Sequence, residues 1–313
     1  MTENKVYYSK LLLFGEYSVI CDSMGLAVPL NLFEASWKFY DLPGNSTVET
    51  ALNEDLRGFY AYLRKLRESN QLLTELDLVR FENDLNQGLF FDSSIPQGFG
   101  VGSSGALCAA TFERYQKNQV TLASDAGDGF QRLKKALAQM ESYFHGVSSG
   151  LDPLLCYLQK PLLIKNKTSI DFVDLPPDLQ FPGFSIFLID TGVVGKTGPL
   201  VNRFFEECRK YNYYKRIVNE LIPANNRCIE ALVANDVELL FNTLPNLSLF
   251  FFDHFKAMIP NAFHSHWKHG LDSGDYFLKL CGSGGGGFLL GFTRNRQVTQ
   301  KYFSEQDISL IHL

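Results

Sequence analysis

The sequence lacks several features that would each indicate a particular class of protein. Its 313 residues contain no run of the roughly eighteen apolar residues that a membrane-spanning helix needs, and the apolar block Leu11–Phe14 is too short for a signal peptide. It also lacks an excess of positive charge, since 29 Lys and Arg residues stand against 34 Asp and Glu residues, for a net charge of -5. A protein that binds the nucleic-acid backbone normally needs a basic face. We therefore expect a cytoplasmic protein that binds neither a membrane nor nucleic acid.

Cysteine pairs with C-x-x-C spacing are absent as well. Six cysteines are scattered along the chain, in stretches that otherwise have the composition of core or loop. This pattern predicts free thiols in a reducing compartment rather than a disulfide framework. The six are Cys21, Cys108, Cys156, Cys208, Cys228 and Cys281.

The length and composition are those of a globular protein with room for two cores. Hydrophobic residues make up 45% of the chain and charged residues 20%. Two proline-containing turns, Leu175–Pro177 and Phe181–Gly183, mark a boundary between segments. We expect an N-terminal domain over residues 1–178 and a C-terminal domain over residues 179–313.

A glycine loop is the most informative stretch of the first domain. Gly98, Gly100, Gly102 and Gly105 stand within eight residues, and small residues that suit a helix follow from Ser104 to Ala110. A glycine loop that leads into a helix N-terminus presents free backbone N–H groups to an anion, with Ser103 and Ser104 at the cap. The alternative is an ordinary tight turn before a helix.

Two other nucleotide motifs fit less well. No lysine follows the loop as in a Walker A sequence, and in the stretch Gly192–Thr197 the first glycine of that motif would fall on Asp190. A dinucleotide fingerprint can be written from Gly100, with Asp125 as its acidic residue, but no suitable strand clearly precedes it. A nicotinamide enzyme is therefore not favoured.

Lys10 is unusual because it lies in an apolar strand. The segment Val6–Ile20 predicts a strand, a tight turn at Gly15–Glu16 and the start of another strand. Lys10 could guard a sheet edge against aggregation, or it could be buried with an acidic partner. The next elements that we expect are the strands Ala27–Phe33, Glu34–Tyr40, Leu78–Asp84 and Gly88–Asp92, and the helix Glu54–Ser69.

A second polar cluster follows the predicted helix Gln131–Phe144. Glu141 and His145 stand one turn apart, and the chain continues through a small-residue loop to Asp152. Two carboxylates and a histidine from one helix and its trailing loop suit a metal and proton-transfer site. The alternative is a loop in which Asp152 only serves as a turn or cap residue.

The C-terminal segment predicts a split βαβ arrangement. The pattern predicts strands over Phe184–Asp190, Tyr276–Leu280, Phe288–Phe292 and Ile308–Leu313. It predicts helices over Leu200–Leu221, Arg227–Thr243, Ser248–Met258 and Arg296–Ser304. Five glycines within Gly282–Gly287 indicate that something approaches this backbone closely, since a hairpin turn needs only one or two. Phe250–Phe252 are expected in the core, with a homodimer face as the alternative.

Four motifs in order resemble the galactokinase, homoserine kinase, mevalonate kinase and phosphomevalonate kinase (GHMP kinase) superfamily. Lys10–Val19 resembles K-x-x-L-x-G-E-H-x-V, and Pro96–Ala106 resembles the phosphate loop P-x-x-x-G-L-G-S-S-A-A. Lys279–Gly287 resembles K-x-T-G-A-G-G-G-G, and Glu141–Asp152 is similar to the mevalonate kinase motif E-x-x-x-H-G-x-P-S-G-x-D. The resemblance spans nearly the whole chain.

This resemblance implies an α+β fold of two domains, an N-terminal mixed α/β nucleotide-binding domain and a C-terminal ferredoxin-like domain. It implies ATP and Mg²⁺ as cofactors, with Ser104 and Glu141 as metal ligands. Asp152 would orient or deprotonate the substrate hydroxyl, with Lys10 beside it. The implied phosphate-binding residues are Gly98, Gly100, Val101, Gly102, Ser103, Ser104, Gly105 and Ala106. The implied substrate-binding residues are Glu16, Tyr17, His145, Ser149, Gly150, Gly284 and Gly285.

Several positions depart from the family motifs. Tyr17 stands where mevalonate kinases usually have histidine, Ser148 replaces a proline, and Gly105 replaces the first of two alanines. Cys281 and Ser283 replace threonine and alanine. The implied activity is transfer of the γ-phosphoryl group of ATP to a small alcohol, with mevalonate as the leading acceptor. Phosphomevalonate, a sugar or an amino alcohol are alternatives, as is a nucleotide-binding homologue without turnover.

Overall fold

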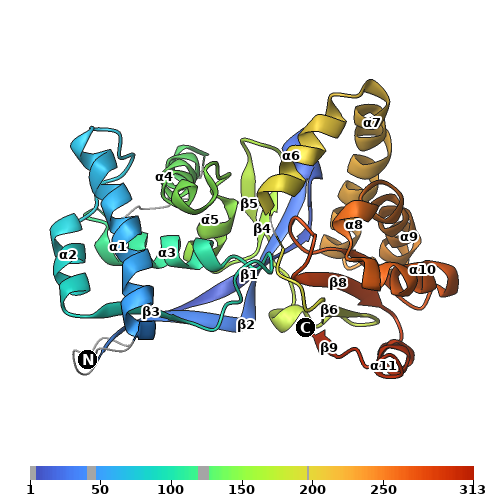
Figure 1. Cartoon of the computed structure of the whole chain (residues 1–313). Helices are drawn as coiled ribbons and strands as arrows, with labels where there is room; N and C mark the ends of the chain where they lie inside the picture. The colour runs from blue at the N-terminus through green and yellow to red at the C-terminus, as the bar shows by residue number, and fades with distance from the viewer. Residues whose placement is uncertain (1–4, 41–46, 119–126, 196) are drawn as a thin grey trace. The chain divides into compact units, whose positions relative to one another are not determined.

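The computed structural model of the chain (Figure 1) describes residues 5–40, 47–118, 127–195 and 197–313. Asp125 and Lys196, which belong to the two motifs that fit less well, lie outside these residues. The chain divides into two compact units. The first comprises Met1–Lys10, Pro29–Pro96 and Gly102–Gln159, and the second comprises Leu11–Val28, Gln97–Val101 and Lys160–Leu313. Each unit is thus assembled from three separate segments, whereas the domain boundary at residue 178 is a single division, which stays a prediction.

Five strands of the described residues form the first sheet, in the order β1-β2-β4-β5, with β3 also paired to β2. The strand β2 is longer than predicted, because a single strand covers the range expected to hold two. It pairs antiparallel with both β3 and β4, at opposite ends of its length. The strands are β1 (Val6–Phe14), β2 (Gly25–Phe39), β3 (Leu89–Ser93), β4 (Leu162–Ile164) and β5 (Ile170–Phe172).

The connection from β1 to β2 differs from the prediction. The expected strand after Gly15 is wrong, because the chain forms a turn and then the 3₁₀ helix η1 (Ser18–Cys21). Tyr17 has φ 63°, in the left-handed region, so the backbone reverses here instead of extending. The consequence is that the motif residues Glu16 and Tyr17 stand on a tight turn.

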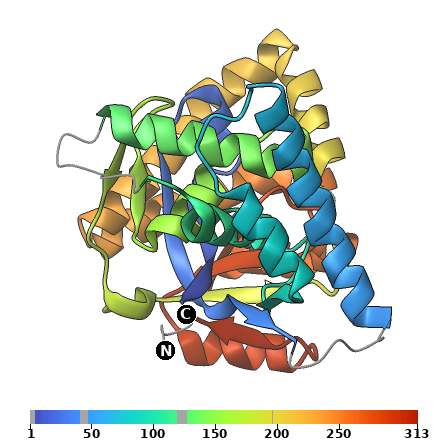
Figure 2. The ribbon, with the colours of Figure 1, turned by 90° about the vertical axis from the view of Figure 1, so that its left-hand side faces the viewer.

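The helices of the first unit lie together in both views, coloured from light blue to green (Figure 1, Figure 2). In the described residues they are α1 (Thr47–Glu68), α2 (Leu78–Asn86), α3 (Ser103–Tyr115), α4 (Gly127–His145) and α5 (Leu151–Leu158). The predicted helices that start near Ser104 and end near Phe144 are confirmed as α3 and α4. The predicted loop that ends in Asp152 is partly wrong, since Asp152 lies in the first turn of α5.

The predicted strand Leu78–Asp84 is also wrong, since this segment is the helix α2. The side chain of Asp77 caps it by accepting from the N–H of Arg80 at 3.0 Å. Leu78, Phe81 and Leu85 are buried, and their spacing of three and four residues is that of one helical face. The capping aspartate and this spacing outweigh the apolar composition that suggested a strand.

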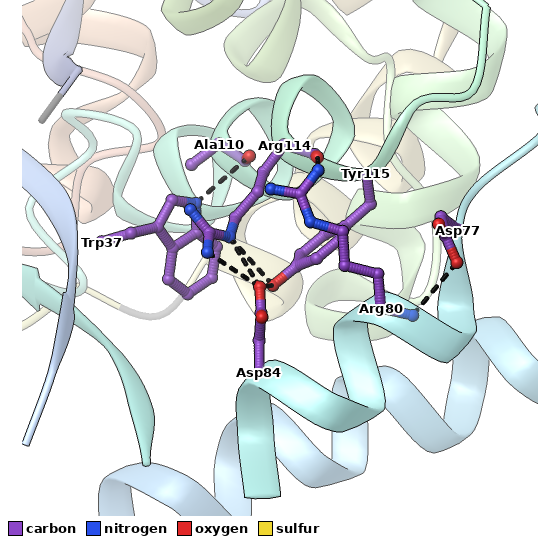
Figure 3. A network of polar contacts seen from close by, with 7 residues as sticks. All are labelled: Trp37, Asp77, Arg80, Asp84, Ala110, Arg114 and Tyr115. Carbon is purple, nitrogen blue, oxygen red and sulfur yellow. Dashed lines mark hydrogen bonds and ion pairs between the residues drawn. The ribbon is translucent and has the colours of Figure 1, made fainter. Parts of the chain in front are cut away.

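A polar network joins α2 to α3, the helix that carries Ser104 (Figure 3). Asp84 of α2 accepts from Arg114 Nε and Nη2, at 2.9 and 2.8 Å, and from the hydroxyl of Tyr115 at 2.9 Å. Trp37 of β2 donates from Nε1 to the carbonyl oxygen of Ala110, at 3.2 Å. The C-terminal half of α3 is therefore fixed to both a helix and the sheet.

The second unit contains a four-stranded antiparallel sheet in the order β7-β8-β6-β9. Its strands are β6 (Ser185–Asp190), β7 (Phe277–Leu280), β8 (Phe288–Thr293) and β9 (Leu310–His312), with α11 (Arg296–Ser304) between the last two. This order is that of a split βαβ arrangement, so the predicted ferredoxin-like topology is confirmed. The helices α9 (Val237–His254) and α10 (His264–Ser273) pack against β7.

The helices of this unit are divided differently from the prediction. They are α6 (Thr197–Cys208), α7 (Tyr211–Arg216), the π-helical turn η3 (Ile217–Leu221), α8 (Ile222–Val233), α9 (Val237–His254) and α10 (His264–Ser273), with the 3₁₀ turns η2 (Pro177–Leu179), η4 (Lys256–Met258) and η5 (Asn261–Phe263). The prediction of one continuous helix over 200–221 is wrong. The break between helices that was expected near residue 245 is also wrong, because α8 and α9 are separated at 234–236. Asn235 has φ 53°, and Asp236 caps α9 by accepting from the N–H of Leu239.

The structure settles three further points, on side-chain burial, on the cysteines and on the hydropathy of the helices. Phe250 and Phe251 are 5% and 1% exposed, which confirms core packing for these two residues, whereas Phe252 is only partly buried. All six cysteines are free, as predicted. Among the described residues, no helix is both long and apolar enough to cross a membrane.

Candidate active site

The first glycine loop feeds the N-terminus of α3, as predicted. Gly102 is the N-cap residue, with φ 83° in the left-handed region. A Cβ atom at this position would lie 2.6 Å from Cγ of Lys10, so a larger residue would collide with the lysine side chain. Glycine is therefore required at position 102 for two reasons: its backbone is left-handed, and the Lys10 side chain occupies the space that a Cβ atom would need.

Lys10 reaches from β1 to the carboxylate of Asp152. Its Nζ lies 2.8 Å from Oδ2 of Asp152, and the two side chains are 6% and 40% exposed. β1 stands at the end of the strand order, but Lys10 is buried and ion-paired. The interpretation of Lys10 as an exposed edge-strand lysine that prevents aggregation is therefore wrong. The ion pair fixes the carboxylate of Asp152 beside Lys10 and leaves it partly accessible to solvent.

Gly105 brings α3 and α5 close together at Asp152. A Cβ atom at position 105 would lie 2.9 Å from the backbone carbon of Asp152 and 3.0 Å from the backbone nitrogen of Pro153. The glycine that stands where the resembling motif has alanine therefore allows a close approach of these two helices. Ser104 and Asp152 are consequently carried by helix N-termini that pack directly on each other.

Glu141 of α4 faces the N-terminus of α3. The hydroxyl of Ser104 donates to Oε1 of Glu141 at 3.1 Å and lies 2.9 Å from Nε2 of His145. Glu141 is 4% exposed. Burial, and then the nearby charge of Asp152, raise the pKa of Glu141 to about 7, while hydrogen bonds from Ser148 and Ser104 and the charge of Lys10 oppose this shift.

Ser148 is a member of this cluster that the site prediction missed. Its hydroxyl donates to Oε2 of Glu141 and accepts from the N–H of Gly150 at 2.9 Å. The sequence contained one signal, because a hydroxyl stands at position 148 where the resembling motif has proline. Because this polar side chain follows Glu141 by seven residues, the replacement of proline by serine could have indicated that Ser148 belongs to the site.

The oxygen atoms of this cluster fit a Mg²⁺ ion. Ser104 and Glu141 offer a hydroxyl and a carboxylate, and Mg²⁺ in kinases is usually held by one or two carboxylates together with substrate phosphates. In the part of the chain that the structure describes, no group of three or more His, Cys, Asp or Glu side chains is arranged to hold a metal ion. A nucleotide's phosphates would therefore have to supply part of the coordination.

Glu16 and Tyr17, predicted to bind substrate, are buried in the second unit. Glu16 Oε1 lies 2.6 Å from Nζ of Lys279 on β7, and the two side chains are 1% and 2% exposed. The hydroxyl of Tyr17 donates to the carbonyl oxygen of Ser283 at 2.6 Å. These contacts fix the turn after β1 to β7 and to the second glycine turn. Lys279 begins one of the four motifs, but the sequence predicts no role for it.

The second glycine turn packs against backbone from other loops of the same unit. The N–H of Gly287 donates to the carbonyl oxygen of Val193 at 2.6 Å, and the N–H of Gly285 donates to that of Met258 at 2.6 Å. The N–H of Gly195 donates to the carbonyl oxygen of Gly98 at 3.0 Å. The close approach predicted for this turn is thus made by the protein's own main chain.

The predicted site residues are distributed over both units. The first unit holds Lys10, Gly102, Ser103, Ser104, Gly105, Ala106, Glu141, His145, Ser149, Gly150 and Asp152. The second unit holds Glu16, Tyr17, Gly98, Gly100, Val101, Gly284 and Gly285. The side chains of Ala106 and Val101 are buried, and the exposed Ser149 uses its hydroxyl to accept from the N–H of Leu151 at 3.3 Å. The roles of all these residues stay predictions.

Comparison with curated proteins finds relatives of one kind. A mevalonate kinase from Thermococcus onnurineus is 26% identical over 215 residues, which is 64% of this chain and 61% of that protein. That match spans less than two thirds of the relative's length. A mevalonate kinase from Thermococcus sibiricus is 23% identical over 316 residues, covering 92% of this chain and 88% of the relative. No protein-family model matches the chain.

Solved structures show which proteins share the fold of this chain. The structure of L. major mevalonate kinase in complex with R-mevalonate matches with a TM-score of 0.66 and 16% identity, over 100% of this chain and 96% of that one. The chain therefore has the fold of this kinase. The structure of Lactococcus lactis galactokinase complexed with galactose matches this chain with a TM-score of 0.65 and 14% identity, over 99% and 93% of the two chains. The predicted fold class is therefore confirmed, and the fold is shared by kinases whose structures hold different small molecules.

Proposed function

We propose that this protein is an ATP-dependent kinase that transfers the γ-phosphoryl group to a hydroxyl of a small alcohol, with mevalonate as the acceptor. The observation that carries the proposal is the Lys10–Asp152 ion pair beside the N-terminus of α3. Support for a kinase of this superfamily comes from the relatives described above.

The cluster contains the groups that phosphoryl transfer requires. Free N–H groups at the start of α3, reinforced by the helix dipole, suit the phosphates of a nucleotide. Asp152 would accept the proton of the attacking hydroxyl or orient this hydroxyl, and Lys10 would stand beside its carboxylate as the counter-ion. Ser104 and Glu141 would hold Mg²⁺, which neutralises charge on the phosphates when it is bound.

Mevalonate is preferred because both curated relatives described above are mevalonate kinases. Tyr17 departs from the histidine of the mevalonate kinase motif, and its hydroxyl is already bonded to Ser283. Phosphomevalonate, a sugar or an amino alcohol are therefore the alternative acceptors. A nucleotide-binding protein without turnover is the alternative of another class, and the retention of Lys10, Glu141 and Asp152 argues against it.

ADP release in the presence of ATP, Mg²⁺ and a panel of alcohols tests the proposal. The panel contains mevalonate, phosphomevalonate, galactose and homoserine, and we expect turnover with mevalonate. Asp152→Asn should lower turnover by about 100-fold or more and leave ATP binding largely intact. Asp92→Asn is the matched control, because Asp92 pairs with Lys38 on the surface of the same unit. ATP binding without ADP release from any alcohol would favour the homologue without turnover.

A further inference from the structure

Ser148 lies in the short connection between α4 and α5, the two helices that carry Glu141 and Asp152. It is partly buried, and it stands where the resembling motif has a proline. Proline has no side-chain hydroxyl, so the residue of the motif could not make the contacts of Ser148.

Both carboxylate oxygens of Glu141 accept a hydrogen bond from a serine. Oε1 accepts from Ser104 of α3, and Oε2 accepts from Ser148. The carboxylate is therefore held from two directions, which limits its rotation about the terminal side-chain bond. Ser104 is itself a proposed metal ligand, so Ser148 is the partner that orients Glu141 from outside the metal site.

The hydroxyl of Ser148 also accepts from the N–H of Gly150, at 2.9 Å. Gly150 is the N-cap residue of α5, and Asp152 follows in the first turn of that helix. A serine hydroxyl has one proton to donate and lone pairs to accept, so Ser148 uses both capacities here. One side chain thereby links the position of Glu141 to the start of the helix that carries Asp152.

We propose that Ser148 is a positioning residue that holds Glu141 for a divalent cation bound with nucleotide phosphates. This inference rests on the proposed kinase function, and it assigns the residue a role that the family motif does not supply. Mg²⁺ demands near-ideal ligand geometry, so a carboxylate that can rotate binds it less well. Loss of a group that orients a metal ligand typically costs about 10- to 100-fold in metal affinity or activity.

Binding of Mn²⁺ as a probe, in the presence of a non-hydrolysable ATP analogue, tests this role by electron paramagnetic resonance. Ser148→Ala should weaken Mn²⁺ binding by about tenfold or more, whereas Ser148→Thr keeps the hydroxyl and should bind close to the wild-type level. Ser142→Ala is the matched control, because Ser142 follows Glu141 on the same helix and its hydroxyl donates to the carbonyl oxygen of Ala138, with no described contact to Glu141. It should bind Mn²⁺ as the wild type does.

Kinetics separate positioning from a general loss of structure. In Ser148→Ala, the Mg²⁺ concentration needed for half-maximal activity should rise, while kcat at saturating Mg²⁺ should recover most of its wild-type value. Equal Mn²⁺ affinity in the wild type and Ser148→Ala, or equal weakening in Ser142→Ala, would overturn the role of Ser148 alone. Absence of nucleotide-dependent Mn²⁺ binding in the wild type would instead overturn the proposed metal site of the kinase, and this inference with it.

Discussion

The ion pair between Glu16 and Lys279 allows the sharpest test of what holds the second unit together. At 2.6 Å, with both side chains at most 2% exposed, the attraction is about 6 kcal/mol for an effective dielectric constant of about 20. Removal of two charges from water offsets much of this, at several kcal/mol for each ion. The intact pair is therefore close to neutral for stability, whereas loss of one partner leaves a buried charge without its counter-ion.

Lys279→Met keeps the aliphatic bulk of the side chain and removes its charge. We expect this variant to lower the free energy of unfolding by about 3 to 5 kcal/mol, and Glu16→Gln by a similar amount. The double variant should lose much less than the sum of the two, with a coupling energy of at least about 2 kcal/mol.

Urea unfolding followed by tryptophan fluorescence measures these values. The chain contains two tryptophans, Trp37 in the first unit and the buried Trp267 in the second. In a Trp37→Phe background, the remaining fluorescence reports on the unit that contains the pair.

The matched control is the exposed pair Lys268–Asp272 on α10, which has a similar distance of 2.8 Å but side chains that are 63% and 64% exposed. Lys268→Met should change the free energy of unfolding by no more than about 1 kcal/mol. Equal effects of Lys279→Met and Lys268→Met, or strictly additive effects of the two buried substitutions, would refute this reasoning.

Three further perturbations have expected outcomes. Gly105→Ala places a methyl group 2.9 Å from the backbone of Asp152, so we expect a loss of about 1 to 3 kcal/mol in urea unfolding and lower turnover; unchanged values would show that α3 and α5 can move apart without cost. The raised pKa of Glu141, about 7, means that the metal-free folded state binds a proton more tightly than the unfolded chain. The stability from this group is present at low pH and lost as pH rises through 7, so Glu141→Gln should gain stability relative to the wild type between pH 5 and pH 8; a difference independent of pH would contradict this. Burial, and then the neighbouring Cys21, raise the pKa of Cys208 to about 12, so its alkylation by iodoacetamide should be slow at pH 7.5 and accelerate up to pH 11; rapid modification at pH 7.5 would contradict this.

Local sequence signals predicted those parts of the fold that depend on local contacts. The helix after the first glycine loop and the helix that ends before Gly146 follow from apolar spacing and from glycine at the termini. The strand β2 was divided in two, and α2 was mistaken for a strand, because apolar composition alone does not separate a short helix from a strand. The cap at Asp77 was the signal that would have corrected α2.

The candidate site was only partly predictable for a different reason. The motifs supplied Lys10, Ser104, Glu141 and Asp152 by resemblance, but no rule of spacing places residues that are up to 142 positions apart in one cluster. The role of Ser148 depends on which way its hydroxyl faces, and a sequence does not contain that direction.

The sequence by itself determined the residue types of the first glycine loop, the free thiols and the order of the strands in the C-terminal segment, because these follow from composition, spacing and local backbone preference. The tertiary structure alone decided that Lys10 is paired with Asp152 and Glu16 with Lys279. A buried charge must find a counter-ion, but the packing of strands and helices selects which carboxylate is within reach.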